Sequence, residues 1–215
     1  MITLDILSDP ICPWCYIGKH RLEKAMAAAG VNPFEITWRP FQLNPDMPAE
    51  GVDRTAYLET KFGKKRAAGF YAQIEETAKA DGLDVDFAAI KRTPNTIDAH
   101  RVIRWAAQAG HQTPLVQELF ERYFTRGQDI SDHAVLSDAA EIAGLDRDVI
   151  VRALSTDADR DAVIDEDKQA RTMGVNSVPT FIVAGRHVVN GAQPPELWER
   201  VIQDILSLDG TKGTA

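Results

Sequence analysis

The stretch that decides the fold is Cys12-Pro13-Trp14-Cys15, which contains the only two cysteines of the 215-residue chain. An apolar run over residues 2–7 alternates as a strand does and precedes the motif, and a helical pattern follows it up to Gly30. Pro13 suits the first position of a helix, because the N–H that proline lacks has no partner there. A Cys-x-x-Cys between a strand and a helix is typical of a redox-active dithiol.

The spacing of the two cysteines predicts different roles for them. The free N–H groups and the positive dipole end of a helix favour the thiolate form of Cys12, which is the nucleophilic form. We expect Cys12 to be exposed and to attack first. Cys15, one turn further on and more buried, would resolve the mixed disulfide. Pro13 and Trp14 are expected to tune how strongly the thiolate is favoured.

Metal binding or a structural role is the alternative use of the motif. A zinc site normally needs two further Cys or His ligands, and the chain has no second Cys-x-x-Cys. A structural disulfide between residues three apart would close almost no loop, so it would restrict the unfolded chain very little. We therefore predict redox chemistry, with no metal site and no tightly bound cofactor.

Beyond the motif, the predicted secondary structure changes twice along the chain. Residues 34–39 alternate as a second strand that ends at Pro40, and helical periodicity then predominates over roughly a hundred residues with almost no strand signal. One of these helices is predicted to begin at Asn95, a good N-cap residue. The last third predicts a helix, two strands and a final helix, over residues 158–173, 178–183, 187–190 and from 195 on.

This order predicts an α/β protein. A helical crossover makes the first two strands parallel neighbours, and a short turn makes the last two an antiparallel pair. The fold class is a thioredoxin fold with an all-helical domain inserted after the second strand. We expect residues 1–45 and 156–210 to form the thioredoxin-like domain and residues 46–155 to form the insert.

Charge and composition exclude several classes of function and location. The chain has 32 acidic and 24 basic residues and a formal net charge of -8, which argues against binding to nucleic acid or to an anionic membrane. No apolar run approaches the ~20 residues of a membrane-spanning helix. Met1 leads directly into a strand without the features of a signal peptide, so we expect a cytoplasmic protein.

Five segments carry a family resemblance. They are Ser8–Gly18, Arg39–Leu43, Asn95–Thr96 with Ala99–Arg101, Gly174–Phe181 and Asn190–Pro194. In this order they resemble the DsbA-like thioredoxin family in its FrnE-type branch, which is grouped with 2-hydroxychromene-2-carboxylate isomerases and kappa-class glutathione transferases. The resemblance implies a thioredoxin fold with a helical insert, and a cis peptide before Pro179 lying against the dithiol.

The resemblance also implies substrate-binding residues. Val178 and Pro179 would align a substrate disulfide, or the cysteine of glutathione, over Cys12, with the Val178 main chain pairing as in strand addition. Gly191 and Ala192 occupy the turn that faces the γ-glutamyl end of glutathione in the glutathione-using relatives; the alternative is a plain turn.

Three further polar residues are weaker candidates. We interpret His100 as structural rather than catalytic. Lys19 would either tune Cys12 electrostatically or belong to the solvated surface, which is the default interpretation. Asp9 would either oppose thiolate formation or help proton transfer. The acidic run 157–167 is expected to be a solvated helix face.

Two functional classes remain. The first is a thiol–disulfide oxidoreductase that exchanges with protein or small-molecule disulfides. The second is a glutathione-dependent transferase or isomerase, with glutathione as co-substrate. Such relatives typically carry Ser at the position of Cys12, so the two cysteines favour the dithiol reaction. A chaperone or binding role is a distant third, and the kappa-class resemblance makes a homodimer one expected assembly.

Overall fold

Strand β1 (Ile2–Ser8) lies at the centre of a four-stranded sheet. The computed structural model describes the backbone of residues 1–211 and the side chains of that range except 64–68, 70 and 209–211. The strand order is β2-β1-β5-β6, with β2 at Phe34–Pro40, β5 at Thr180–Val183 and β6 at His187–Asn190. β1 and β2 are parallel, and β5 is antiparallel to both β1 and β6. The predicted parallel and antiparallel pairs are thus both confirmed.

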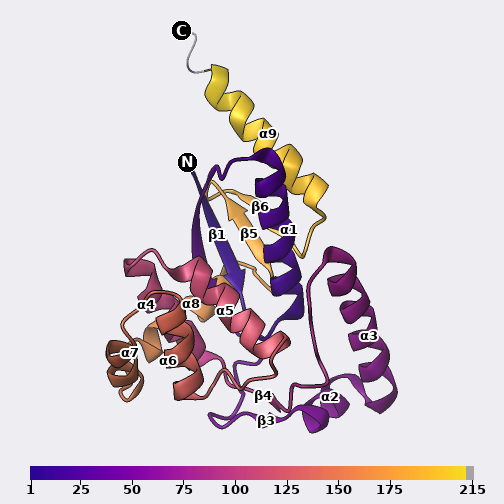
Figure 1. The fold of residues 1–215 in the computed structure, drawn as a ribbon, viewed down its shortest axis with the longest axis vertical. Coiled ribbons are helices and arrows are strands. Elements are labelled where there is room, and N and C mark those ends of the chain that lie inside the picture. The colour runs from indigo at the N-terminus through magenta and orange to yellow at the C-terminus, as the bar shows by residue number, and fades with distance from the viewer. Residues whose placement is uncertain (212–215) are drawn as a thin grey trace.

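Two long helices, α1 (Pro13–Ala29) and α9 (Pro195–Thr211), pack together beside this sheet (Figure 1). Gly30 ends α1 in a left-handed conformation with φ of 66°, as glycine at this position favours. Trp198 of α9 is completely buried and contacts Phe181 of β5 edge-on, with ring centroids 4.8 Å apart. This packing joins the C-terminal helix to the centre of the sheet.

A largely helical segment lies between β2 and β5 and occupies the lower half of Figure 1. Its helices are α2 (Arg54–Phe62), α3 (Lys64–Asp81), α4 (Ile97–Gln108), α5 (Gln112–Phe124), α6 (His133–Ile142), α7 (Arg147–Leu154) and α8 (Arg160–Thr172). A two-stranded ribbon, β3 (Val52–Asp53) with β4 (Arg92–Thr93), joins residues that the sequence placed in an all-helical region. Strands of two residues are too short to give a periodic signal. Helix α8 contacts both α4 and β2, and the division into two domains stays a prediction.

Two details of the helical segment differ from the sequence prediction. Helix α4 begins at Ile97 with Thr96 as its N-cap residue, and Asn95 instead accepts a hydrogen bond from the Ile97 N–H at 2.9 Å. The acidic run is not wholly solvated, because Asp167 is 3% exposed and accepts a hydrogen bond from the Gln42 N–H. The second difference arises from a contact with Gln42, which lies outside α8.

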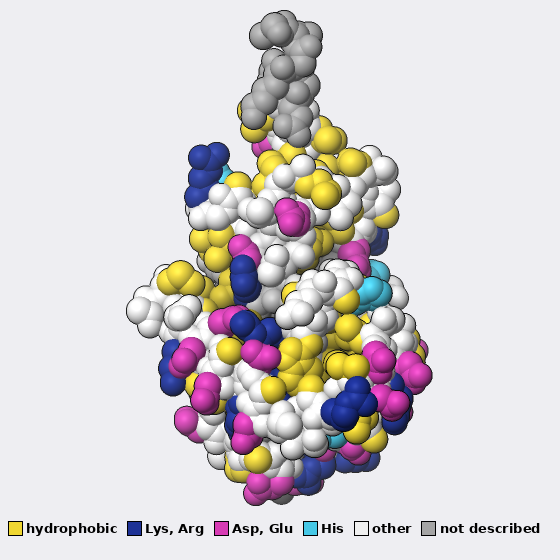
Figure 2. Space-filling view, turned by 90° about the vertical axis from the view of Figure 1, so that its left-hand side faces the viewer, with side chains coloured by type: hydrophobic (Ala, Val, Ile, Leu, Met, Phe, Trp, Pro, Cys, Tyr) yellow, Lys and Arg dark blue, Asp and Glu magenta, His cyan; other side chains and the backbone are white. Residues whose placement is uncertain are grey.

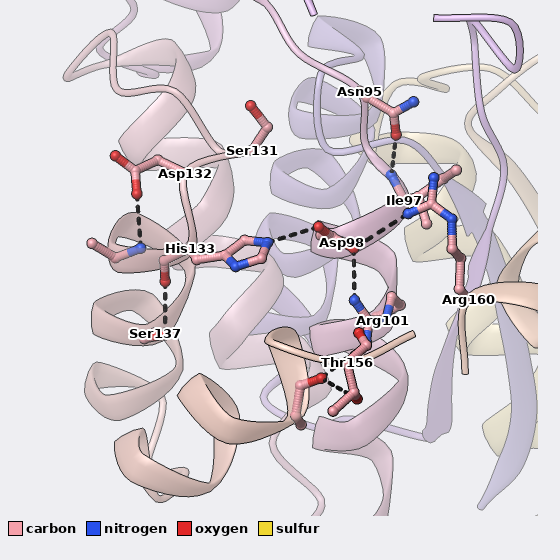
Figure 3. A network of polar contacts seen from close by, with 12 residues as sticks. Asn95, Ile97, Asp98, Arg101, Ser131, Asp132, His133, Ser137, Thr156 and Arg160 are labelled. Carbon is pink, nitrogen blue, oxygen red and sulfur yellow. Dashed lines mark hydrogen bonds and ion pairs between the residues drawn. The ribbon is translucent and has the colours of Figure 1, made fainter. Parts of the chain in front are cut away.

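Asp98 joins three helices of the segment (Figure 3). Asp98 lies in α4, where its carboxylate accepts a hydrogen bond from Arg101 at 2.8 Å. It also accepts one from His133 of α6 at 2.9 Å, and the guanidinium group of Arg160 in α8 lies 4.0 Å away. Burial opposes the charge of Asp98, but the bonds from Arg101 and His133 outweigh it and lower the pKa of the carboxyl group. The ionised carboxylate is therefore part of the packing.

The surface around these helices is mixed in charge. Figure 2 shows acidic and basic side chains interspersed over the lower, helical half of one face, around a hollow with apolar side chains. Among the described residues, no helix is both long enough and apolar enough to cross a membrane.

Asp98→Asn tests the network. We expect a loss of about 2 kcal/mol in the free energy of unfolding at pH 7, because the charge-assisted bonds to Arg101 and His133 are lost. The folded-state pKa is lowered, so this stabilisation is full above the unfolded-state pKa of about 3.9 and is lost as the pH falls through the folded-state value. Denaturant unfolding at pH 7 and at low pH measures it.

Asp165→Asn is the matched control, because Asp165 is an exposed carboxylate of α8 whose ion pair among the described residues is with Lys168. It should change stability by less than about 0.5 kcal/mol at either pH. An Asp98→Asn effect that is equal at both pH values would contradict the assignment of an ionised Asp98.

Candidate active site

Both cysteines lie at the N-terminal end of α1. Cys12 is the N-cap residue with an extended backbone, and Pro13 occupies the first helical position. The N–H of Cys12 donates to the Asp9 carbonyl at 2.9 Å, and the Cys15 N–H donates to the Cys12 carbonyl at 3.0 Å. This one turn of backbone places the two side chains on the same end of the helix.

The expectation that Cys12 is exposed was wrong. Cys12 is 3% exposed and Cys15 is 1% exposed, and both are free thiols. The Cys12 Sγ atom lies 3.7 Å from the carbonyl oxygen of Val178, 166 residues further along the chain. The segment before β5 therefore covers Cys12, whereas Pro13 and Trp14 are half-buried. Sequence spacing alone contains no information on this long-range contact.

Cys15 is held as a protonated thiol. Burial raises its pKa well above the usual value, and the hydrogen bond and charge of the neighbouring Cys12 add to the rise. Bonds from Ser8 and from the Asp9 backbone oppose the shift without cancelling it. A protonated Cys15 beside Cys12 suits a resolving cysteine that acts only after the first attack.

The predicted substrate-binding residues meet at the same end of α1. The Val178–Pro179 peptide is cis, and the Pro179 carbonyl accepts a hydrogen bond from the Gly191 N–H at 2.8 Å. A Cβ atom on Gly18 of α1 would lie 3.0 Å from the Pro179 side chain and 3.5 Å from Ala192. The absence of a side chain at Gly18 is what allows α1 to approach both segments.

The turn after β6 is also bonded to α1 directly. The Arg21 guanidinium donates to the Ala192 carbonyl oxygen at 2.6 Å and to Asp81 of α3 at 2.7 Å. Gly191 and Ala192 are each half-buried. The structure therefore brings both residues next to Pro179, while their role towards a substrate stays a prediction.

Asp9 is a completely buried carboxyl group behind the motif. Its two oxygens accept hydrogen bonds from the Ile11 N–H at 3.2 Å and the Leu43 N–H at 2.7 Å. Burial raises the pKa of Asp9 to about 7, although these bonds partly oppose the rise. Asp9 thus joins the loop after β1 to the segment after β2, and it changes protonation state near neutral pH.

His100 and Lys19 are both buried, although only Lys19 was expected at the surface. His100 is 3% exposed, and burial lowers its pKa to about 4, so its ring is neutral at pH 7. Lys19 was expected at the solvated surface, but it is 3% exposed and donates to Glu23 and to Gln117 of α5, each at 2.6 Å. The α1–α5 packing that buries it is a tertiary contact that helical periodicity does not reveal.

The sequence prediction missed a buried arginine of the helical segment. Arg54, the first residue of α2, is 6% exposed and contacts Tyr71 of α3 and Tyr123 of α5. A lone arginine beside Asp53 at a predicted helix start gives no sign of burial, since most arginines are exposed.

A comparison with protein-family models identifies the family of this chain. The model of the DsbA-like thioredoxin domain matches residues 3–203. The chain belongs to the DsbA-like thioredoxin domain family. The α/β fold class and the family resemblance found in the sequence are both confirmed.

Individual proteins are similar to this chain over nearly its whole length. The chain is similar to a probable DsbA oxidoreductase from Streptomyces coelicolor, with a TM-score of 0.85 and 28% identity over 96% of this chain and 91% of that one. It is 27% identical to the uncharacterized protein YwbO of Bacillus subtilis, over 94% of this chain and 96% of the relative. A cytosolic disulfide reductase, DsbM from Pseudomonas aeruginosa solved with GSH, shares the fold with a TM-score of 0.68 and 18% identity, over 95% and 99% of the two chains.

Asp9→Asn should remove a pH dependence of stability. The folded-state pKa of about 7 lies above the unfolded value, so the folded protein holds an extra proton between about pH 4 and 7, and the free energy of unfolding falls as the pH rises through this window. Between pH 5 and pH 8 the contribution is on the order of 3 kcal/mol. Denaturant unfolding of both proteins at the two pH values measures it, and an unchanged dependence in Asp9→Asn would refute the assignment.

Gly18→Val should destabilise the site end of α1. The added side chain meets Pro179 and Phe181 in a packed environment, which costs about 1–3 kcal/mol of stability. Gly69→Val is the control, because a Cβ atom on Gly69 of α3 would have no atom of the described side chains or backbone within 4 Å. Equal melting temperatures for the two variants would show that α1 has room at Gly18.

Proposed function

We propose that this protein is a thiol–disulfide oxidoreductase that uses Cys12 and Cys15. One observation carries the proposal: two free cysteines lie in the first turn of α1, and the Sγ atom of Cys12 is 3.7 Å from the Val178 carbonyl oxygen. The DsbA-like family membership supports the same chemistry.

The reduced form would act on a substrate disulfide in two steps. The Cys12 thiolate attacks one sulfur, forms a mixed disulfide and expels the other substrate sulfur as a thiolate, which takes up a proton. Cys15 then loses its proton and attacks Cys12 Sγ, which releases the second substrate sulfur. The substrate gains two electrons and two protons, and the protein is left with the Cys12–Cys15 disulfide. The reverse sequence oxidises a substrate dithiol.

Burial of Cys12 constrains how the substrate would bind. An extended segment could lie along the Val178 main chain, where strand-type hydrogen bonds would hold it over Cys12. A groove of about 460 Å³ begins at Leu43, whose N–H is bonded to Asp9, and continues along Pro45, Met47, Val52 and Tyr57. Its largely apolar lining suits the apolar part of a protein or small-molecule substrate.

A glutathione-dependent transferase or isomerase is the second candidate. It is supported by the GSH in the DsbM structure and by the position of Gly191 and Ala192 beside Pro179. The description of DsbM as cytosolic also favours action in the cytoplasm, where glutathione would be the available thiol. A homodimer is a further proposal drawn from the family resemblance.

Single serine variants test the oxidoreductase proposal. Cys12→Ser should abolish insulin-disulfide reduction with dithiothreitol as electron donor, because the attacking sulfur is gone. Cys15→Ser should accumulate a mixed disulfide with substrate that mass spectrometry detects. Unaltered disulfide exchange in both variants would eliminate the redox function.

A parallel assay of glutathione conjugation distinguishes the second candidate. The oxidoreductase proposal expects no conjugation by the wild-type protein or by Cys12→Ser. Retained or increased glutathione turnover in Cys12→Ser would instead favour the transferase function, because the serine hydroxyl at position 12 would then support the reaction.

A further inference from the structure

Arg21 of α1 connects two segments that are far apart in the sequence. Its Nε atom donates to the Asp81 carboxylate of α3 at 2.7 Å, and its Nη1 atom donates to the Ala192 carbonyl at 2.6 Å. Helix α3 lies beside α1 (Figure 1), and the His20 ring of α1 also donates to the main-chain carbonyl of Asp81 at 2.9 Å. Arg21 therefore links the helical segment to the turn after β6.

The guanidinium group of Arg21 is planar, so its two hydrogen bonds are not independent. The side chains of Arg21 and Asp81 are 17% and 14% exposed, so the ion pair is largely shielded from water. Because the carboxylate orients the guanidinium plane, the direction of the second bond, to the Ala192 carbonyl, is also set. A charge-assisted bond thus determines where the turn lies.

Gly18 acts on the same turn as Arg21. It precedes Arg21 by three residues, so the two lie on the same face of α1. A Cβ atom on Gly18 would be 3.5 Å from Ala192 and 3.0 Å from the Pro179 side chain. The missing side chain lets the turn approach the helix, and Arg21 bonds the turn in that place.

The turn extends the pairing of β5 with β6 towards the dithiol. The Gly191 N–H donates to the Pro179 carbonyl at 2.8 Å, in the register of the two strands. Continued by one residue, this register places Ala192 opposite Val178, whose carbonyl oxygen lies 3.7 Å from the Cys12 Sγ atom. A peptide that lies along the Val178 main chain over Cys12 would therefore also meet this turn.

Two main-chain N–H groups at this place lack an acceptor. Neither the Val178 N–H nor the Ala192 N–H donates a hydrogen bond within the described part of the chain. The neighbouring N–H groups of Gly191 and Gln193 are both used, by the carbonyls of Pro179 and Gly191. Unpaired main-chain donors of this kind bind the carbonyl oxygens of an extended peptide. The main chain of a peptide therefore matches the two groups.

We propose that Arg21, held by Asp81, is a positioning residue that fixes the Gly191–Ala192 turn as a binding surface for the main chain of a peptide that carries the reacting cysteine. The proposal rests on the proposed function. No proton, electron or bond passes through Arg21 during disulfide exchange. Its loss leaves the dithiol chemistry intact and weakens the binding of the peptide.

Arg21→Met tests the proposal during turnover. We expect KM for insulin to rise about tenfold, the weight of one charge-assisted hydrogen bond, with kcat unchanged. The rate at which iodoacetamide alkylates Cys12 in a Cys15→Ser background should also stay the same, because this small reagent does not need the turn. Arg21→Lys should recover part of the loss, since an ammonium group can still donate to the Ala192 carbonyl.

A binding measurement separates this proposal from the oxidoreductase function. In the Cys12→Ser/Cys15→Ser protein, which cannot exchange disulfides, fluorescence anisotropy gives the Kd for reduced insulin B chain labelled with fluorescein. Adding Arg21→Met in this background should raise the Kd about tenfold, even if the insulin-reduction assay shows no activity. An unchanged Kd, or no binding in either protein, would overturn the proposal.

Arg92→Met is the matched control. Arg92 of β4 likewise donates to one main-chain carbonyl, that of Glu50, and pairs with one aspartate, Asp129, at 3.4 Å. Its loss should leave KM, kcat and the Kd unchanged, because neither partner belongs to the turn. An equal effect of Arg92→Met would overturn the proposal. A fall in kcat and in the alkylation rate of Arg21→Met would also overturn it, in favour of a general packing role.

Discussion

The pairing of β1 on both of its edges is the constraint on which the rest of the structure depends. Parallel β2 and antiparallel β5 flank it, so that the carboxyl ends of β1 and β2 and the beginning of β5 lie at the same end of the sheet. The dithiol follows β1, and the segment that holds Leu43 follows β2. The Val178–Pro179 peptide directly precedes β5. A change of register in either pair would separate the Val178 carbonyl from Cys12, whatever the two residues were.

The segment after β2 is held from two sides by buried carboxylates. Asp9 accepts the Leu43 N–H from the dithiol loop, and Asp167 of α8 accepts the Gln42 N–H. Arg171 lies over the Phe41 ring, with its guanidinium carbon 4.2 Å from the centroid, and also donates to Asp167. The helical segment therefore does more than cover the sheet, because α8 holds the segment after β2 in place through Asp167.

Local features were predictable from the sequence, and contacts between distant segments were not. The Cys-x-x-Cys spacing, Pro13 and Gly30 each act within one helical turn, so the position and limits of α1 followed from them. The parallel and antiparallel strand pairs followed from the length of their connections. Burial of Cys12, Lys19 and Arg54 depends on contacts with distant residues. Val178 lies 166 residues from Cys12, Gln117 of α5 lies 98 residues from Lys19, and Tyr123 lies 69 residues from Arg54. Asp9 is intermediate: its position beside the motif was visible, but its raised pKa depends on the Leu43 contact and on complete burial.

The distance of 166 residues between Cys12 and Val178 also has a consequence during synthesis of the chain. At a translation rate of about 5–20 residues per second, Val178 is made on the order of 10 to 30 s after Cys12. Throughout that interval the nascent chain carries a dithiol that has lost neither its hydration nor its access to oxidants. The folded site therefore shields its sulfurs from solvent in a way that the growing chain cannot until the last strands pair.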